Sequence, residues 1–201
     1  MRLIPMSSRL LLTSLLLMPY LLMTQGANAK MQGLELLAHP GHWEIVNDGV
    51  MGGRSQSRLS EALTKQQEYI LRFSGQVSLE NNGGFASVSR SLNHEEQHTL
   101  KQSNPRRISV EALGDGKRYQ LRLKVLKQGQ LVGYKAGFTT QAATDGQWSF
   151  EPSDFIETFR GNDYPERASP DFTQIIAVGL LIGDGQEGDF ELQLREIGIQ
   201  E

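Results

Sequence analysis

Short runs in which hydrophobic and polar residues alternate recur along the chain after residue 29. In one run Leu121, Leu123 and Val125 alternate with Arg122 and Lys124. A period of two places the hydrophobic side chains on one face of a β-strand and the polar ones on the other. No later stretch keeps the 3.6-residue hydrophobic period that a core helix requires. The pattern therefore predicts an all-β fold built from half-buried strands.

Two other segments, residues 108–112 and 134–138, alternate in the same way. In residues 175–182 both alternating sets are hydrophobic, which is typical of a strand covered on both faces. We therefore expect residues 175–182 to form a central strand of a sheet.

The last hydrophobic run changes register part-way along. Hydrophobic residues alternate over residues 190–194 and resume at Ile197 and Ile199, one position out of step. One extra residue in a strand, a β-bulge, would restore the alternation. The sequence predicts such a bulge near Arg195 and Glu196.

Glycine-containing turns separate these runs, at residues 81–84, 114–116, 144–146 and 183–185. Their Asn-Gly and Asp-Gly pairs supply the positive φ angles that tight hairpins require. Many short strands joined by such turns are typical of a β-sandwich or a barrel.

Three polar segments interrupt the strand pattern. Residues 60–67 are compatible with a short helix. Residues 94–107 and 159–172 contain prolines and are predicted to be long loops. Long loops in a compact β-domain are functional or mobile.

The first 29 residues have the features of a secretory signal peptide. Arg2 and Arg9 precede an uncharged run rich in leucine and methionine at residues 10–23, and an Ala-Asn-Ala site follows at residues 27–29. A retained membrane anchor is the alternative, but a spanning helix needs about 20 apolar residues. We therefore expect cleavage after Ala29.

This interpretation predicts a signal peptide at residues 1–29 and one mature domain at residues 30–201, without a transmembrane segment. The protein would be secreted across the inner membrane and located in the periplasm. The mature domain would hold together through its core and its strand pairing alone, because the chain has no cysteine.

Composition excludes several classes of function. Without cysteine there can be no disulfide, thiolate nucleophile or cysteine-based metal site. The chain has 20 Lys and Arg against 23 Asp and Glu, a net charge of -3, and so lacks the basic excess of nucleic-acid binders. No nucleotide-binding loop or hydrolase nucleophile motif occurs.

The sharpest motif match is His94-Glu95-Glu96-Gln97-His98. On a helix, His94 and His98 would share one face and bind zinc, with Glu95 as general base of a hydrolase. The neighbouring residues are too polar to pack such a helix, and no third ligand follows. We therefore interpret the motif as a solvated loop and predict no metal site there. His39 and His42 are interpreted as flanking a Pro-Gly turn.

Acidic residues near the turn at residues 183–185 are a second candidate metal site. Oxygen ligands there could hold calcium, but we favour a polar hairpin loop with alternating exposed acidic residues. The acidic residues are Asp184, Glu187, Asp189 and Glu191.

Two glycine-rich loops, residues 47–55 and 81–87, are the remaining candidates for function. Consecutive glycines allow a backbone or a ligand to approach closely. The two loops could therefore form a ligand site or simply brace one another.

Several motifs follow one another in a fixed order between Trp43 and Ile199. They are Asn47-Asp48-Gly49-Val50-Met51-Gly52-Gly53 with Ser55, Phe73-x-Gly75, Asn82-Gly83-Gly84-Phe85-Ala86-Ser87, Gly114-Asp115-Gly116-Lys117 with Tyr119, Pro152 with Asp154-Phe155, Phe159-Arg160-Gly161, and Gly188-Asp189-Phe190 with Leu192. Their order and spacing resemble the complex I intermediate-associated protein 30 (CIA30) family. The resemblance covers essentially the whole chain after the signal segment.

The resemblance implies a single galactose-binding-like domain, a jelly-roll β-sandwich. It also implies a non-catalytic binding domain without a cofactor, similar to assembly factors of respiratory complex I (NADH:ubiquinone oxidoreductase) that act through protein-protein contacts. The partner would be a membrane complex or an assembly intermediate. The secretory signal departs from the mitochondrial members and would allow contact only with the outer side of a membrane complex.

We expect the binding surface at the loop end of the sandwich, because aromatic and arginine side chains dominate interface energies. The candidate residues are Asn47, Asp48, Met51, Arg54, Asn82, Phe85, Phe159 and Arg160.

A periplasmic carbohydrate-binding module is the main alternative. An aromatic platform beside amide and carboxylate groups would bind a sugar, and Trp148, Tyr134, Asn82 and Asp48 could supply both. A zinc-dependent hydrolase acting through His94, Glu95 and His98 is the third hypothesis.

Overall fold

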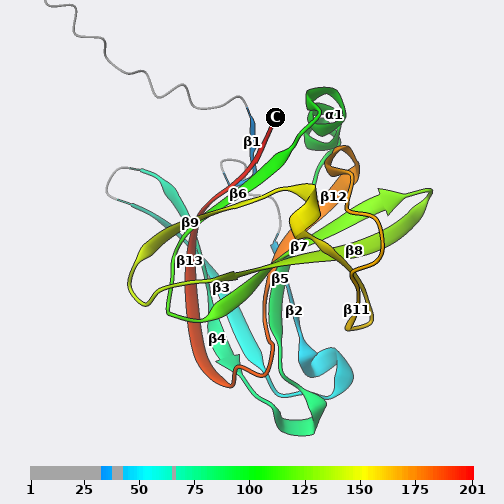
Figure 1. Cartoon of the computed structure of the whole chain (residues 1–201). Helices are drawn as coiled ribbons and strands as arrows, with labels where there is room; N and C mark the ends of the chain where they lie inside the picture. Colours follow the sequence, from blue (N-terminus) through cyan, green and yellow to red (C-terminus); the bar gives the residue numbers. More distant parts are fainter. Residues whose placement is uncertain (1–32, 38–42, 65–66) are drawn as a thin grey trace, which may run out of the picture. The chain divides into compact units, whose positions relative to one another are not determined.

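The alternating runs pair into two antiparallel sheets in the computed structural model, which describes residues 33–37, 43–64 and 67–201 (Figure 1). The six-stranded sheet has the order β3 (Gln56–Leu63), β4 (Tyr69–Val77), β13 (Gly188–Gln200), β6 (Arg107–Leu113) and β9 (Asp145–Phe150), and β1 (Gly33–Glu35) also pairs with β13. The seven-stranded sheet has the order β11 (Asn162–Tyr164), β10 (Ile156–Phe159), β8 (Gln130–Thr139), β7 (Arg118–Lys127), β12 (Ile175–Ile182), β5 (Ala86–Ser91) and β2 (Trp43–Asn47).

The hydrophobic faces of the two sheets form one core, as the alternation predicts. Leu121, Leu123 and Val125 of β7 are buried, while Arg122 and Lys124 face the other way. The prediction of an all-β jelly-roll sandwich is confirmed. The central strand is confirmed too, because β12 lies between β7 and β5 and is largely covered along its length.

The predicted bulge is present in β13. The pairing of β13 with β6 shifts register between Leu194 and Glu196, which leaves Arg195 as the extra residue. Ile197 and Ile199 thereby return to the core, where both are buried.

The prediction of a short helix at residues 60–67 is wrong for the part of this segment that the structure describes. Residues 56–63 form β3 and pair one by one with β4 in antiparallel register, from Gln56 opposite Gln76 to Leu63 opposite Tyr69. The segment looked helical because β3 is an edge strand with mostly exposed side chains, so hydrophobic alternation is weak there. Residues 65–66 lie outside the described part.

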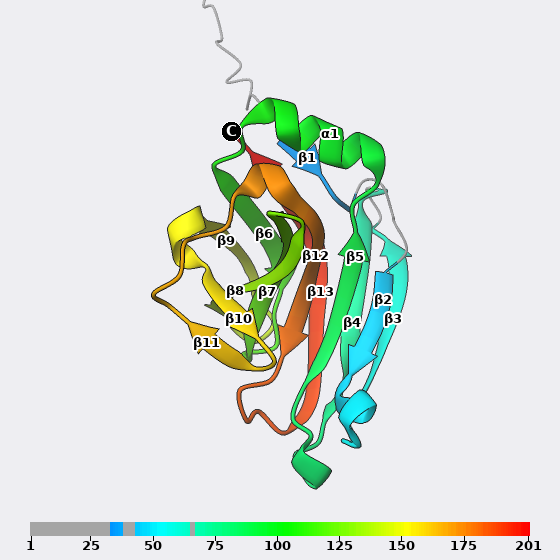
Figure 2. The same ribbon diagram turned by 90° about the vertical axis from the view of Figure 1, so that its right-hand side faces the viewer.

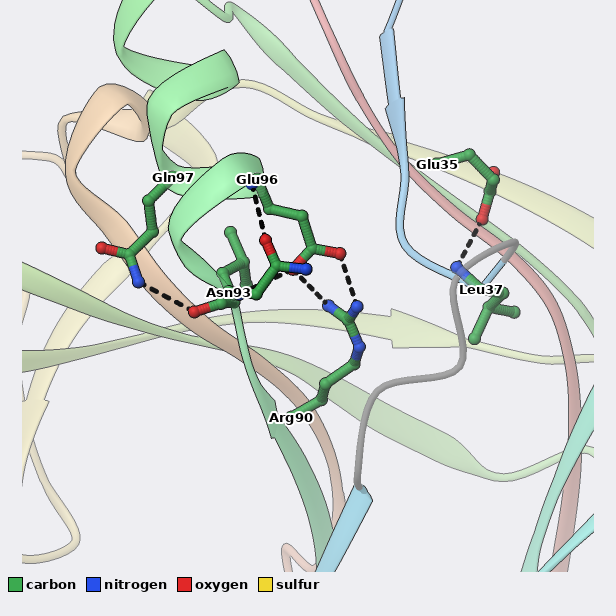
Figure 3. A network of polar contacts seen from close by, with 7 residues as sticks. Glu35, Leu37, Arg90, Asn93, Glu96 and Gln97 are labelled. Carbon is green, nitrogen blue, oxygen red and sulfur yellow. Dashed lines mark hydrogen bonds and ion pairs between the residues drawn. The ribbon is translucent and has the colours of Figure 1, made fainter.

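The prediction of a loop at residues 94–107 is also wrong, because His94–Ser103 forms α1. A capping box begins this helix: the Asn93 side chain accepts from the Glu96 backbone N–H at 2.9 Å, and the Glu96 carboxylate accepts from the Asn93 backbone N–H at 2.8 Å. The Glu96 carboxylate also pairs with the buried Arg90 of β5 (Figure 3). One buried ion pair and the buried Leu100 thus replace the apolar stripe that the sequence lacks.

The segment at residues 159–172 is shorter as a loop than predicted. Residues 162–164 form β11 and pair with β10, and a 3-10 turn, η4 (Phe172–Gln174), follows the prolines. Arg167 holds the segment between β11 and η4 against β10, because it pairs with the buried Glu157 carboxylate. Its guanidinium also lies over the Tyr164 ring at 3.9 Å.

The elements are distributed unequally between the two ends of the sandwich (Figure 2). Helix α1 lies across one end, whereas two 3-10 turns, η1 (Asp48–Met51) and η2 (Glu80–Asn82), lie at the opposite end. Both predicted glycine-rich loops therefore meet at one end. Within the described residues, no helix is long and apolar enough to span a membrane. The predicted signal peptide lies outside them.

Candidate functional site

The two glycine-rich loops are tied together by one buried carboxylate, that of Asp48. The backbone N–H of Ser55 donates to Asp48 Oδ1 at 2.9 Å, and the Ser55 hydroxyl donates to Oδ2. From the other loop, the N–H groups of Gly84 and Phe85 donate to Oδ2 at 2.7 and 3.2 Å. Asp48 therefore braces the loops and is not available to a ligand.

Two glycines leave the room that this carboxylate needs. A Cβ atom at Gly53 would lie 2.4 Å from Asp48 Cγ, and one at Gly83 would lie 2.6 Å from Asp48 Oδ2. Both distances are far shorter than van der Waals contact, so a larger residue would push the carboxylate out of its cradle. This requirement explains one glycine of each Gly-Gly pair, and the positive φ angles of Gly52 (90°) and Gly84 (132°) explain the other.

Burial alone would raise the pKa of the Asp48 carboxyl. The hydrogen bonds from Ser55, Gly84 and Phe85 favour the charged form and outweigh burial, so the pKa of Asp48 lies below its ordinary value. The loop end is therefore held together by an ionised carboxylate at neutral pH.

Beside these braced loops lies an open groove of about 780 Å³, here called the outer groove. It lies on the face of the seven-stranded sheet that points away from the core. Its walls include Gln120 and Arg122 of β7, Lys135 of β8 and Thr158 of β10. Its rim includes Met51 of η1, Phe85 before β5 and Arg160 after β10, and Asp163 and Asp184 also line it.

A row of hydrogen bonds crosses the groove from one element to the next. Asp184 accepts from Gln120 Nε2 at 2.9 Å, and Gln120 Oε1 accepts from Arg122 at 3.0 Å. On the other side Arg122 donates to the Thr158 hydroxyl at 3.0 Å. The Arg122 guanidinium is thus held between two neutral acceptors with its orientation set.

Three of the eight predicted binding residues, Met51, Phe85 and Arg160, come together in the outer groove. Phe159 does not line the groove: Thr158 faces it, so the next side chain along β10 lies on the other face, where Phe159 is 58% exposed, and the Arg160 guanidinium lies over its ring at 5.2 Å. Phe159 and Arg160 therefore present an aromatic and a cation to solvent as a unit.

The other predicted residues have structural roles or stay at the loop surface. Asn47 accepts from the Ser57 hydroxyl at 2.8 Å, so it links the end of β2 to β3. Arg54 forms an exposed ion pair with Glu80 at 3.0 Å. Asn82 is exposed with a φ of 58°, as a turn residue.

The sequence alone did not single out the side chains of the groove wall. Arg122 and Lys135 appeared only as the polar partners in alternating strands, the ordinary pattern of a solvated face. They face each other because β7 and β8 pair with Arg122 opposite Lys135. Strand register was the missing information, and one sequence does not supply it.

The zinc-like motif does lie on a helix, but its residues do not converge on a site. His94, Glu95 and His98 are all exposed, and Glu96 is committed to Arg90. Within the described residues no group of three His, Asp or Glu side chains is placed to hold a metal ion. That finding also covers the acidic residues near residue 184, while His39 and His42 lie outside the description.

The aromatic platform predicted for a sugar does not form. Tyr134 is buried, and its hydroxyl donates to the Ala168 carbonyl at 3.2 Å. Trp148 lies on β9 in the other sheet and packs against Phe138, with ring centroids 4.7 Å apart. Asp48 is the buried brace, so this residue set cannot bind one ligand.

Comparison with known families identifies the chain. The family model of complex I intermediate-associated protein 30 (CIA30) matches residues 32–194. The chain belongs to the CIA30 family. The resemblance inferred from the motifs is therefore confirmed. A comparison with curated protein sequences finds no match for this CIA30 chain.

Solved structures share the fold of this CIA30 domain. A family 11 carbohydrate-binding module of the cellulosomal cellulase Lic26A-Cel5E of Clostridium thermocellum is similar with a TM-score of 0.63 and 12% identity, over 85% of this chain and 95% of the module. A family 11 module from the same organism, in complex with a β-1,3-1,4-mixed-linked tetrasaccharide, has a TM-score of 0.57 and 12% identity, over 84% and 94% of the two chains. At 12% identity, this structural similarity shows that the chains share a fold.

Proposed function

We propose that this CIA30 domain is a non-catalytic protein-binding domain and that its partner contacts the outer groove and its rim. The observation that carries the proposal is the gathering of Met51, Phe85 and Arg160 around one groove, with Met51 65% exposed and the 58% exposed Phe159 in contact with Arg160. Methionine, aromatic and arginine side chains are the types that interface cores favour.

The rigidity of the site supports the proposal. The loops are braced through Asp48, and a row of hydrogen bonds joins the side chains of the groove wall. A pre-organised surface loses less conformational entropy on binding than a flexible one.

The family points to the kind of partner. We propose a membrane protein complex or one of its assembly intermediates, as the name of the family indicates for its namesake. With the predicted secretory signal, the contact would be made from the periplasmic side. The kind of partner and the periplasmic side are both proposals, and the binding site proposed above depends on neither of them.

The test is a quantitative capture from crosslinked native cells with the full-length chain as bait. We expect a defined partner with the wild type and a loss of about tenfold or more with the Phe159→Ala, Arg160→Ala double variant, because interface hot spots contribute about 2 kcal/mol or more. The matched control is Arg58→Ala with Leu63→Ala, another exposed arginine and hydrophobic residue, on β3 of the other sheet. Equal capture by both double variants would refute the proposal.

Carbohydrate remains the alternative ligand, because the related folds include a module bound to a tetrasaccharide and because the groove wall carries hydrogen-bonding side chains. The lining contains one aromatic residue, Phe85, and no tryptophan or tyrosine among the described residues. Sugar rings commonly require a larger aromatic face, so the geometry favours protein. Binding of a neutral glucan oligosaccharide that disappears in Arg122→Gln would favour carbohydrate instead.

A further inference from the structure

Arg122 occupies an unusual electrostatic position in the outer groove. Its side chain is half-buried, yet it forms no ion pair with any carboxylate of the described residues. Its two hydrogen bonds go to the neutral oxygens of Gln120 and Thr158. A guanidinium has five N–H donors, so three of them lack an acceptor within the described part of the chain.

The nearby carboxylates are already engaged by other groups. Asp163 pairs with Lys135 Nζ at 2.8 Å, and Asp184 accepts from Gln120 and lies 3.8 Å from Arg118 Nε. Burial lowers the pKa of Arg122, and the charges of Asp163 and Asp184 only partly compensate. A cation that is partly removed from water is stabilised by a paired carboxylate, which a binding partner can supply.

A second cation points to the same place. Arg160 lines the groove, forms no ion pair with any of the described residues, and lies with its guanidinium over the ring of Phe159. After the Lys135–Asp163 pair is set aside, the groove therefore presents two guanidiniums without a carboxylate in pairing distance. Arginine binds a carboxylate through two parallel hydrogen bonds, a geometry that a fixed orientation favours.

We propose that the outer groove recognises an acidic segment of a partner protein, with a carboxylate of that segment bound by Arg122 and a second acidic group by Arg160. This inference rests on the proposed protein-binding function and adds the chemistry of the partner. The exposed Met51 at the rim, and the exposed Phe159 in contact with Arg160, favour a peptide segment with hydrophobic residues beside its acidic ones over an acidic glycan, which offers no such side chains.

The test measures binding of a fluorescein-labelled oligoglutamate peptide to the full-length chain by fluorescence anisotropy, with an oligoglutamine peptide of equal length as the neutral probe. We expect roughly tenfold weaker binding of oligoglutamate by Arg122→Gln, because a charge-assisted hydrogen-bonded pair contributes about 1.5–3 kcal/mol. Arg122→Lys retains the positive charge but not the planar guanidinium. Its affinity for oligoglutamate should therefore lie between those of wild type and Arg122→Gln.

The matched control is Lys124→Gln, which removes one positive charge from the same face of the same strand but outside the groove lining. We expect its affinity to stay within about twofold of wild type, since exposed charges act weakly at physiological salt. Arg160→Gln provides an exposed second variant if Arg122→Gln disturbs folding, and thermal unfolding of each variant shows whether it does.

Two results would overturn the inference. One is equal binding of oligoglutamate and oligoglutamine, and the other is an equal loss in Lys124→Gln and Arg122→Gln. Binding of polygalacturonate that depends on Arg122, without binding of oligoglutamate, would replace the acidic protein segment by an acidic glycan. If the partner is still captured through Phe159 and Arg160 while oligoglutamate fails, only the chemistry of the partner is wrong and the protein-binding function stands.

Discussion

At the scale of single residues, the loop end depends on a few buried polar groups more than on hydrophobic contacts. Asp48 satisfies donors from Ser55, Gly84 and Phe85, which lie in two separate loops. Losing one acceptor in such a cluster leaves several buried N–H groups without a partner, and each such group costs about 1–3 kcal/mol. The orientation of the groove rim therefore depends on one carboxylate.

We expect Asp48→Asn to lower the free energy of unfolding by about 2 kcal/mol at neutral pH, because an amide supplies one acceptor oxygen where the carboxylate supplies two. Since the folded pKa of Asp48 lies below the ordinary value of 3.8, the stabilisation is fully present above that value. It is lost as the pH falls through the lower folded pKa.

Urea unfolding of wild type and Asp48→Asn over a pH series measures this effect. The difference between the two proteins should narrow as the pH falls below about 3.8. A difference that is constant down to acidic pH would show that the charge of Asp48 contributes nothing to the brace.

The residue scale also shows what the sequence could reveal about the site. The Asn-Asp-Gly and Asn-Gly-Gly motifs identified the two loops, because consecutive glycines in a short segment indicate a turn or a close approach of the backbone. The bracing alternative is the one that Asp48 fulfils. Arg122 and Gln120 could not be found in this way, since a polar residue in an alternating strand is identical in pattern whether it faces bulk solvent or a groove.

At the scale of elements, α1 is the clearest case in which a tertiary contact decides the secondary structure. Its residues are almost all polar, so periodicity predicted a loop. The helix forms because Asn93 and Glu96 build a capping box and the same Glu96 pairs with Arg90 in the core. The pattern of hydrophobic residues cannot predict an ion pair such as Arg90 with Glu96.

Glu96→Ala should destabilise the domain by about 3–5 kcal/mol, because it removes the buried carboxylate that pairs with Arg90 and half of the capping box. Hydrogen exchange should increase throughout His94–Ser103. His98→Ala, an exposed position on the same helix, is the control and should change stability by about 0.5 kcal/mol or less. Unchanged exchange of α1 in Glu96→Ala would contradict this role.

The strands were more predictable than the helix. Alternation located β7, β8 and β12, and one break in the alternation located the bulge of β13. The edge strand β3 was misread because exposure of both faces removes the alternation on which the prediction depends.

At the scale of the whole molecule, the described domain is a sandwich with two chemically different ends. One end is closed by α1 through a buried ion pair, and the other carries braced loops with exposed hydrophobic residues (Figure 2). The sandwich followed from the sequence through the family motifs, since alternation alone predicted either a sandwich or a barrel. The groove did not, because its lining combines β7, β8, β10 and the turn after β12, which only the sheet order brings together.

The central claim is that the outer groove is the surface that meets the partner. The most direct measurement places a photo-crosslinking amino acid at Met51 in one chain and at the exposed Gln147 of β9 in another, and compares the adducts in living cells. The account predicts an adduct of one defined mass from Met51 that disappears in the Phe159→Ala, Arg160→Ala background, and no such adduct from Gln147. The same adduct from Gln147, or none from Met51, would contradict it.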